Sequence, residues 1–185
     1  KRGGKCGQKL RSRTLCEAAR RGDTKGVKRL LTAGANVGRY KDQIAPIHWA
    51  CGLHHLEITS QLLQAGADPR LRGPLEQTPL HMVMSDYFSL SNNACYCVSY
   101  SQRREPGRKD ETTRCLAIAR MLIMKGADVN AIDGKGRTPL GLAVIGRSEA
   151  KVRFLLSHGV DVTLGKGRDD SALMIAAMSR RVRML

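Results

Sequence analysis

The chain has 185 residues, of which 42% are hydrophobic, and 32 Lys and Arg residues against 16 Asp and Glu give it a formal net charge of +16. This size suits a single domain with its own core. No stretch approaches the roughly 18 consecutive apolar residues that a membrane-spanning helix needs. Only 4% of the residues are aromatic. No zinc-finger, helix-turn-helix or base-stacking motif accompanies the positive charge, so the composition also argues against direct recognition of nucleic acid.

The positive charge is concentrated near the N-terminus, where the first 42 residues hold 13 Lys and Arg against three acidic residues. We expect residues 1–10 to be a basic, disordered leader and residues 11–185 to be the folded domain. Such a cluster suits an acidic protein surface, an anionic membrane, nucleic acid or a nuclear import receptor. A solvated leader without a partner is the alternative.

A four-residue phrase recurs along the chain, at residues 45–48 (Ala-Pro-Ile-His), 78–81 (Thr-Pro-Leu-His), 138–141 (Thr-Pro-Leu-Gly) and 171–174 (Ser-Ala-Leu-Met). The first two copies are 33 residues apart, as are the last two, and the middle spacing of 60 is one period plus 27 inserted residues. A period of this length is typical of a solenoid. Thr78 can cap a helix and Pro79 fits the first helical position, so each phrase predicts a short helix.

A second phrase follows each of these helices and keeps the same period. Its centre is a glycine, at Gly34, Gly66, Gly126 and Gly159. The residues before each glycine carry a stripe of buried-helix spacing, for example Ile58, Leu62 and Leu63. The glycine is placed where a helix ends on a left-handed residue. We expect the chain then to turn outward as a β-hairpin finger.

The two phrases resemble the ankyrin repeat, whose pattern opens with Thr-Pro-Leu-His-x-Ala-Ala and closes with Leu-Leu-x-x-Gly-Ala-Asp-Val-Asn. The resemblance covers about residues 15–185. It implies an all-α fold, an ankyrin-repeat solenoid of stacked helix-turn-helix units with β-hairpin loops. The repeats are expected at about 11–42, 43–75, 76–133, 134–166 and 167–185, and the last is incomplete because it lacks the Leu-Leu and the Gly of a second helix.

The third repeat contains the insertion, residues 87–113. Its first half is rich in turn-forming and aromatic residues, and its second half carries the charged run 103–110. A loop longer than about 15 residues in a compact domain is usually functional or disordered. We expect the first half to form a small flap over the groove and the second half to be mobile.

Residues with catalytic or metal-binding chemistry do not form a recognisable site. Cys95, Cys97 and Cys115 lack a fourth ligand at zinc spacing. The resemblance gives His48 and His81 a structural role, in which the imidazole bridges the backbones of neighbouring repeats. We therefore expect no enzyme activity, no cofactor and no metal.

The six cysteines are better read as reduced thiols than as disulfides, because Cys16 and Cys51 fall on core-facing positions of the repeat. This predicts an intracellular protein, in the cytoplasm, the nucleus or both.

In this family the fingers and the exposed side of the first helices form a concave binding groove. The positions carried over to this chain are Lys41, Asp42, Ile44, Leu53, Leu75, Gln77, Asp86, Lys135, Arg137, Ile145, Arg168 and Asp170. Ile44 and Leu75 are apolar at sites normally open to solvent, which is the composition of a binding hot spot. Packing under the neighbouring finger is the alternative for both.

The expected function is therefore that of a protein–protein interaction module. It would act as an adaptor, a scaffold or a substrate-recruiting domain, as in a ubiquitin ligase or in signalling. Its partner would be a protein with an acidic or mixed surface, and the chain a monomeric domain of a longer protein. The alternative is a basic module that binds nucleic acid or anionic lipid through the N-terminal cluster.

Two further features depart from a plain repeat. Residues 122–130 resemble the acceptor of an asparaginyl hydroxylase, with Leu122 eight residues before Asn130, which makes Asn130 a candidate modification site. The turn between the two helices normally carries a Gly with positive φ. This chain keeps it as Gly22 but has His54, Arg147 and Arg180 in the matching places, so we expect left-handed, strained backbone at these residues.

Overall fold

The computed structural model describes residues 14–38, 44–85, 87–88, 98–99, 108–165, 171–172 and 174–175. Several sequence predictions therefore lie outside the described residues. These are the basic leader 1–10, most of the insertion, the turn residue Arg180, and the contact residues Lys41, Asp42, Asp86, Arg168 and Asp170.

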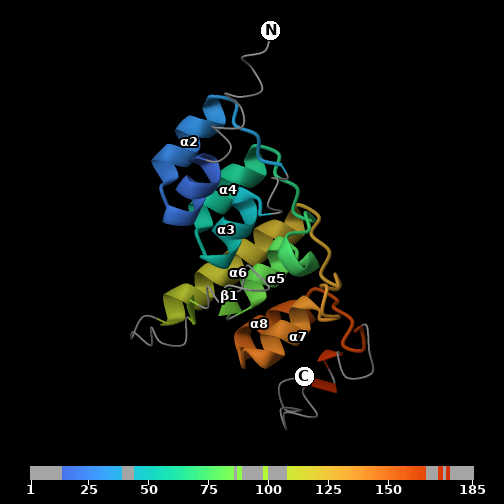
Figure 1. The fold of residues 1–185 in the computed structure, drawn as a ribbon. Coiled ribbons are helices and arrows are strands. Elements are labelled where there is room, and N and C mark those ends of the chain that lie inside the picture. The colour runs from blue at the N-terminus through green and yellow to red at the C-terminus, as the bar shows by residue number, and fades with distance from the viewer. Residues whose placement is uncertain are drawn as a thin grey trace.

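Helices arranged in pairs make up the described chain, and the pairs stack one on the next (Figure 1). The first pair is a helix at residues 14–21 and α2. The elements are α2 (Thr24–Thr32), α3 (Pro46–Gly52), α4 (Leu56–Gln64), α5 (Pro79–Met84), α6 (Arg108–Met124), α7 (Pro139–Ile145) and α8 (Glu149–Leu156). The inner helices α3, α5 and α7 contact one another in sequence, and so do the outer helices α2, α4, α6 and α8. The result is the all-α solenoid that the repeated phrases imply.

The core follows the repeat. Equivalent leucine or isoleucine positions of the inner helices, Ile47, Leu80 and Leu140, are fully buried, and Leu62 and Leu122 of the outer helices are buried against them. Each repeat therefore completes its core only with its neighbours, which is the physical basis of a solenoid.

The two histidines of the repeated phrase have structural roles, and His81 bridges two repeats as predicted, whereas His48 joins Ala45 and Leu71 of its own repeat. Nδ1 of His48 accepts a hydrogen bond from the Ala45 backbone N–H at 3.2 Å, and its Nε2 lies 3.0 Å from the carbonyl oxygen of Leu71. His81 repeats this arrangement, between Thr78 and the carbonyl oxygen of Arg137. Each imidazole thus starts an inner helix and joins it to a finger loop.

Left-handed backbone occurs where the sequence predicts it. The glycines that end the second helices all have positive φ, 79° at Gly34, 86° at Gly66, 91° at Gly126 and 72° at Gly159. In the inter-helix turns, Gly22 has φ 78°, His54 has φ 56° and Arg147 has φ 57°. The prediction of left-handed backbone at His54 and Arg147 is therefore confirmed.

Replacing Arg147 by glycine is expected to stabilise the domain by about 0.5–1 kcal/mol, because relief of left-handed strain outweighs the entropy that Gly adds to the unfolded chain. The gain should exceed that of His54→Gly, since His tolerates this conformation better and its Nδ1 also lies 3.4 Å from Oε1 of Glu111. Urea unfolding of the two variants measures the difference. Destabilisation by Arg147→Gly would contradict the strain argument.

The expected β-hairpin fingers are not formed as paired strands in the described loops 67–78 and 127–138, where the structure has turns and the short 3-10 helix η1 (Pro74–Glu76). Each loop is instead closed by a backbone bond at its base, from Gly73 N to the Gln77 oxygen at 2.8 Å and from Asp133 N to the Arg137 oxygen at 2.9 Å. Earlier in each loop, the carboxylates of Asp68 and Asp128 accept backbone N–H groups two residues on, a local turn that competes with strand pairing.

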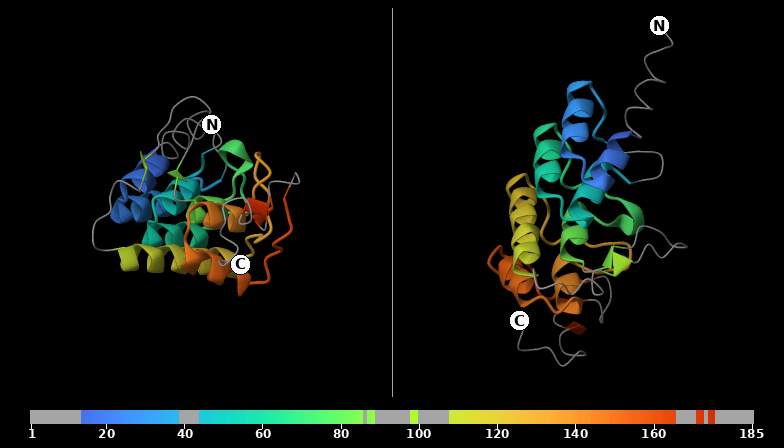
Figure 2. Two further views of the ribbon diagram at one scale, coloured as in Figure 1. Left: turned by 90° about the horizontal axis from the view of Figure 1, so that it is seen from below. Right: turned by 90° about the vertical axis from the view of Figure 1, so that its left-hand side faces the viewer.

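The insertion departs from the solenoid at the inter-helix turn of the third repeat. α6 has 17 residues against nine in α4, because residues 108–115 extend the second helix toward its N-terminus, and residues 108–113 of this extension belong to the expected insertion. Strands β1 (Tyr87–Phe88) and β2 (Val98–Ser99) pair antiparallel, with Tyr87 opposite Ser99. The β1–β2 ladder and the start of α6 lie on the side of the stack that carries the turns between the two helices of each repeat, which we call the turn edge. The finger loops lie on the opposite side (Figures 1 and 2).

Candidate partner-binding surface

The described residues of the predicted contact set fall into two groups. Leu75, Gln77, Lys135 and Arg137 belong to two neighbouring finger loops, which we call the second finger (residues 73–77) and the third finger (residues 133–137). The others lie elsewhere: Leu53 and Ile145 are at the ends of α3 and α7, on the turn edge, and Ile44 is partly buried against the core.

Two contacts join the second finger to the third, and one more joins the residues that directly precede them. The Gly134 N–H donates to the carbonyl oxygen of Leu75 at 2.7 Å. Nε2 of Gln77 lies 3.3 Å from Oδ2 of Asp133, and Nη1 of Arg72 donates to the carbonyl oxygen of Ile132 at 2.9 Å. The two fingers therefore form one unit.

Asp133 is the centre of this unit, and its side chain is fully buried. Its Oδ2 accepts from Nε and Nη2 of Arg137 at 3.1 and 2.8 Å, while Oδ1 accepts the backbone N–H groups of Lys135 and Arg137, each at 2.9 Å. Burial raises the pKa of Asp133, but the hydrogen bonds and charge of Arg137, with that of Gln77, outweigh it and hold the pKa below its usual value. Asp133 is thus ionised in the folded protein.

This network changes what two of the predicted contact residues do. Gln77 is only 7% exposed, and its amide is engaged with Asp133. The guanidinium of Arg137 is likewise paired inside the unit. Both side chains support the fingers, and the predicted residues that remain open at the tips are the half-buried Leu75 and the exposed Lys135.

The tip of the second finger is strained. Leu75 has φ 57° and ψ 28°, and Glu76 has φ 55°. Left-handed backbone at non-glycine residues costs about 1–3 kcal/mol each and persists only where the surroundings impose it. Here the third finger contacts the strained tip through the bond from the Gly134 N–H to the Leu75 oxygen at 2.7 Å, and position 134 must be glycine because a Cβ atom on it would lie 2.9 Å from that oxygen. The sequence carries one signal of this: Glu76 stands where the third finger has Gly136, whose φ is 83°.

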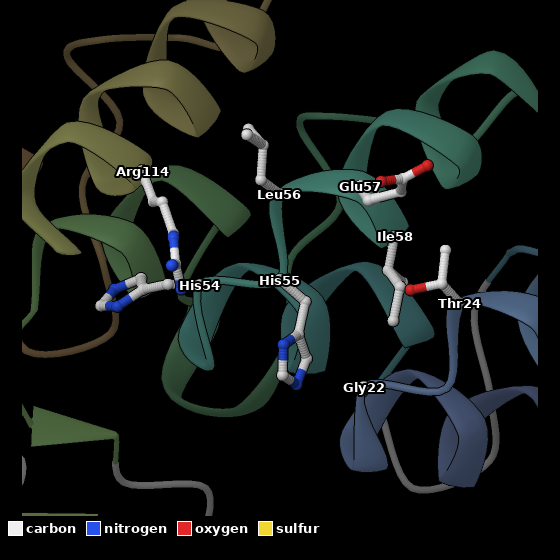
Figure 3. Close-up of a pocket in the computed structure, with 8 residues that line it drawn as sticks. All are labelled: Gly22, Thr24, His54, His55, Leu56, Glu57, Ile58 and Arg114. Carbon is white, nitrogen blue, oxygen red and sulfur yellow. The ribbon is translucent and has the colours of Figure 1, made fainter. Parts of the chain in front are cut away.

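A separate pocket of roughly 240 Å³ opens at the turn edge (Figure 3). It is lined by Gly22, Thr24, His54, His55, Leu56, Glu57, Ile58 and Arg114. Burial lowers the pKa of His55, which is hydrogen-bonded to the backbone of Arg20. Gly22 is needed here, since a Cβ atom on it would lie 3.0 Å from the His55 ring. The turns of the first two repeats are thereby packed together.

Among the described residues, no three His, Cys, Asp or Glu side chains gather as metal ligands, and no helix is long and apolar enough to cross a membrane. Cys16, Cys51 and Cys115 are thiols that take part in no disulfide. Burial raises the pKa of Cys51 to about 12, so this thiol is unreactive at neutral pH.

Asn130 lies in the loop after α6 and links two repeats. Its Oδ1 accepts the backbone N–H of Asp161 at 2.9 Å, and its own N–H donates to Asp128. If Asn130 is a hydroxylase acceptor, protein made in animal cells should carry a partial oxygen addition on this residue, measured by mass spectrometry, and none on Asn36. An unmodified Asn130 in cells with an active asparaginyl hydroxylase would remove it as a candidate.

The stacked helix pairs, the bridging histidines and the left-handed glycines define an ankyrin-repeat protein. The family model for ankyrin repeats, in three copies, matches residues 15–92 and 112–185, and the unmatched gap falls within the insertion. The chain belongs to this family, whose repeats are generally protein–protein interaction modules and form a non-enzymatic fold.

Relatives from distant sources share the repeats. FPV230 of fowlpox virus (strain NVSL), named as an ankyrin repeat protein, is 30% identical over 163 residues, which cover 83% of this chain and 86% of that protein. PhlB of Serratia liquefaciens is 28% identical over 90% of this chain and 62% of its own length. ZDHHC13 of Danio rerio, named as a palmitoyltransferase, is 28% identical over 81% of this chain and only 25% of its own length.

Proposed function

We propose that this chain recruits another protein through the tips of the second and third fingers, with Leu75 as the apolar anchor and Lys135 beside it. The observation that carries this proposal is the strained tip at Leu75 and Glu76, held in place by Gly134. Strain of this kind is concentrated at ligand clamps and switch regions.

The energetics favour such a site. The Asp133 network and the contact between the fingers order the tips before any partner arrives, so binding would cost little conformational entropy. Leu75 offers an apolar contact, and Lys135 adds positive charge in the adjacent loop. The partner that fits is a protein with an apolar pocket and an acidic or mixed rim.

Within a larger protein, the module would serve as an adaptor, a scaffold or a substrate-recruiting domain. We propose that the parent protein is a ubiquitin ligase receptor or a signalling scaffold. We also propose that the domain itself is monomeric. The reduced cysteines support the proposal that the protein works inside the cell, in the cytoplasm or the nucleus.

The experiment is a selection of displayed peptides on the immobilised domain, followed by measurement of Kd for the enriched peptides. Leu75→Ala should weaken binding about tenfold or more, as truncation of a hot spot does. Lys28→Ala, at an exposed position of α2, is the control and should change Kd less than about twofold. Peptides that bind both variants equally well would overturn the assignment of the finger tips.

The net charge of +16 favours a second candidate, a basic module for nucleic acid or anionic lipid. Titration of salt against binding of duplex DNA and of vesicles containing phosphatidylserine tests it. A steep decrease of log Kobs with log salt concentration indicates release of counterions from phosphates. Binding below detection to both probes at physiological salt would exclude this candidate.

A further inference from the structure

The inner helix of the third repeat ends differently from its neighbours. In α3, the carbonyl oxygens of Ala50 and Cys51 accept backbone N–H groups of the following turn, at 2.8 and 3.2 Å. In α7, Ala143 and Val144 do the same, at 3.2 and 3.1 Å. In α5, the equivalent carbonyl oxygens are those of Val83 and Met84, and both accept from a side chain of another repeat.

Lys151 of α8 occupies the place of those turn amides. Its Nζ donates to the carbonyl oxygens of Val83 and Met84, at 3.1 and 3.4 Å. These two residues are the repeat equivalents of Ala50 and Cys51 in α3. A cation at the C-terminal end of a helix also interacts favourably with the helix dipole. An ammonium group of the fourth repeat therefore caps the inner helix of the third.

The position of Lys151 in its own helix is otherwise a core position. It stands eight residues before Gly159, as Ile58 stands before Gly66 and Ile118 before Gly126. Ile58 and Ile118 are buried, and Lys151 is only 4% exposed. Its aliphatic stem thus fills a core site while its amine reaches the end of α5.

The other end of the insertion is held by the second repeat. Glu111 belongs to the part of α6 that extends beyond the usual helix start, and its Oε1 lies 3.4 Å from Nδ1 of His54. The imidazole of His54 is mostly buried, with 10% of the side chain exposed. The left-handed turn residue of the second repeat is thereby in contact with the returning end of the insertion.

We propose that Lys151 and the His54–Glu111 pair are two latches on either side of the insertion. Lys151 fixes the C-terminal end of α5 to the fourth repeat, and Glu111 fixes the start of α6 to the second repeat. The attachment of α5 depends on the fourth repeat being folded and docked.

Hydrogen exchange measured by mass spectrometry tests the first latch. Lys151→Met keeps the aliphatic length and removes the donors, and should speed exchange in peptides from residues 79–99 by about tenfold while α3 changes little. Arg153→Met is the matched control on the same helix, since Arg153 is exposed and pairs with Glu149. The proposal would be overturned if residues 79–99 exchanged at the same rate in Lys151→Met as in the control, or if exchange rose equally in all repeats.

Glu111→Ala tests the second latch at a partly exposed site, and keeps the proposal falsifiable if Lys151→Met does not fold. Exchange should rise in residues 108–113 and stay unchanged in α8. Glu149→Ala, in the first turn of α8, is its control. Equal exchange of residues 108–113 in Glu111→Ala and in Glu149→Ala would show that the insertion is not held there.

Discussion

Replacing Asp133 by alanine is expected to lower the free energy of unfolding by about 3–5 kcal/mol, because it leaves a partly buried guanidinium and several backbone and amide donors without their acceptor. The side chain of Asp133 is fully buried, and it accepts from Arg137, Lys135 and Gln77. The loss extends beyond one loop, since Gln77 belongs to the preceding repeat.

Urea unfolding measures this effect, with Asp128→Ala as the matched control. Asp128 is exposed and accepts the N–H of Asn130 in its own loop, so its removal should cost less than about 1 kcal/mol. The loss of stability in Asp133→Asn should lie between the losses in Asp133→Ala and Asp128→Ala, because Asn keeps the shape of the side chain but not its charge. If the free energy of unfolding of Asp133→Ala lies within about 1 kcal/mol of that of the unsubstituted protein, the network does not hold the fingers together.

Acidification should destabilise the domain through His81. Burial lowers the pKa of His81 to about 4 in the folded protein, against 6.5 for an unperturbed histidine, and the hydrogen bond to the Arg137 backbone only partly opposes this. Between pH 6.5 and pH 4, His81 binds a proton in the unfolded chain but not in the folded protein. Its contribution to stability is therefore fully present above pH 6.5 and is lost as the pH falls toward 4. The shift corresponds to about 3 kcal/mol over this interval.

The structural reason is the ring's hydrogen bonding. Nδ1 of His81 accepts from Thr78, and a proton on that nitrogen would remove the acceptor and leave a buried charge. Unfolding free energies at several pH values, for the protein and for His81→Gln, isolate this contribution. His81→Gln should have the shallower pH dependence between 6.5 and 4. Equal slopes would show that His81 does not titrate in this way.

The sequence by itself determined the features that depend on local chemistry. Helix starts and helix ends depend on residues only a few positions apart. A Pro at the first helical position and a His three residues after the cap mark the start of a helix, and a Gly after an apolar stripe marks its end. The starts of α3, α5 and α7 therefore lie at the repeated phrase, and left-handed backbone occurs at Gly66, His54 and Arg147. The repeat period then implies the stacking, because each unit buries its apolar face only against the next.

Only the tertiary structure decided the features that join residues far apart in the chain. The bond from Gly134 to Leu75, the pairing of Gln77 with Asp133 and the cap of Lys151 on α5 span 59, 56 and 67 or 68 residues. Nothing local marks these partners. Gln77 looks like a free surface residue, and Lys151 like a charge on an outer helix. Their roles depend on how adjacent repeats are placed, because the acceptor of Gln77 belongs to the next finger and those of Lys151 belong to another repeat.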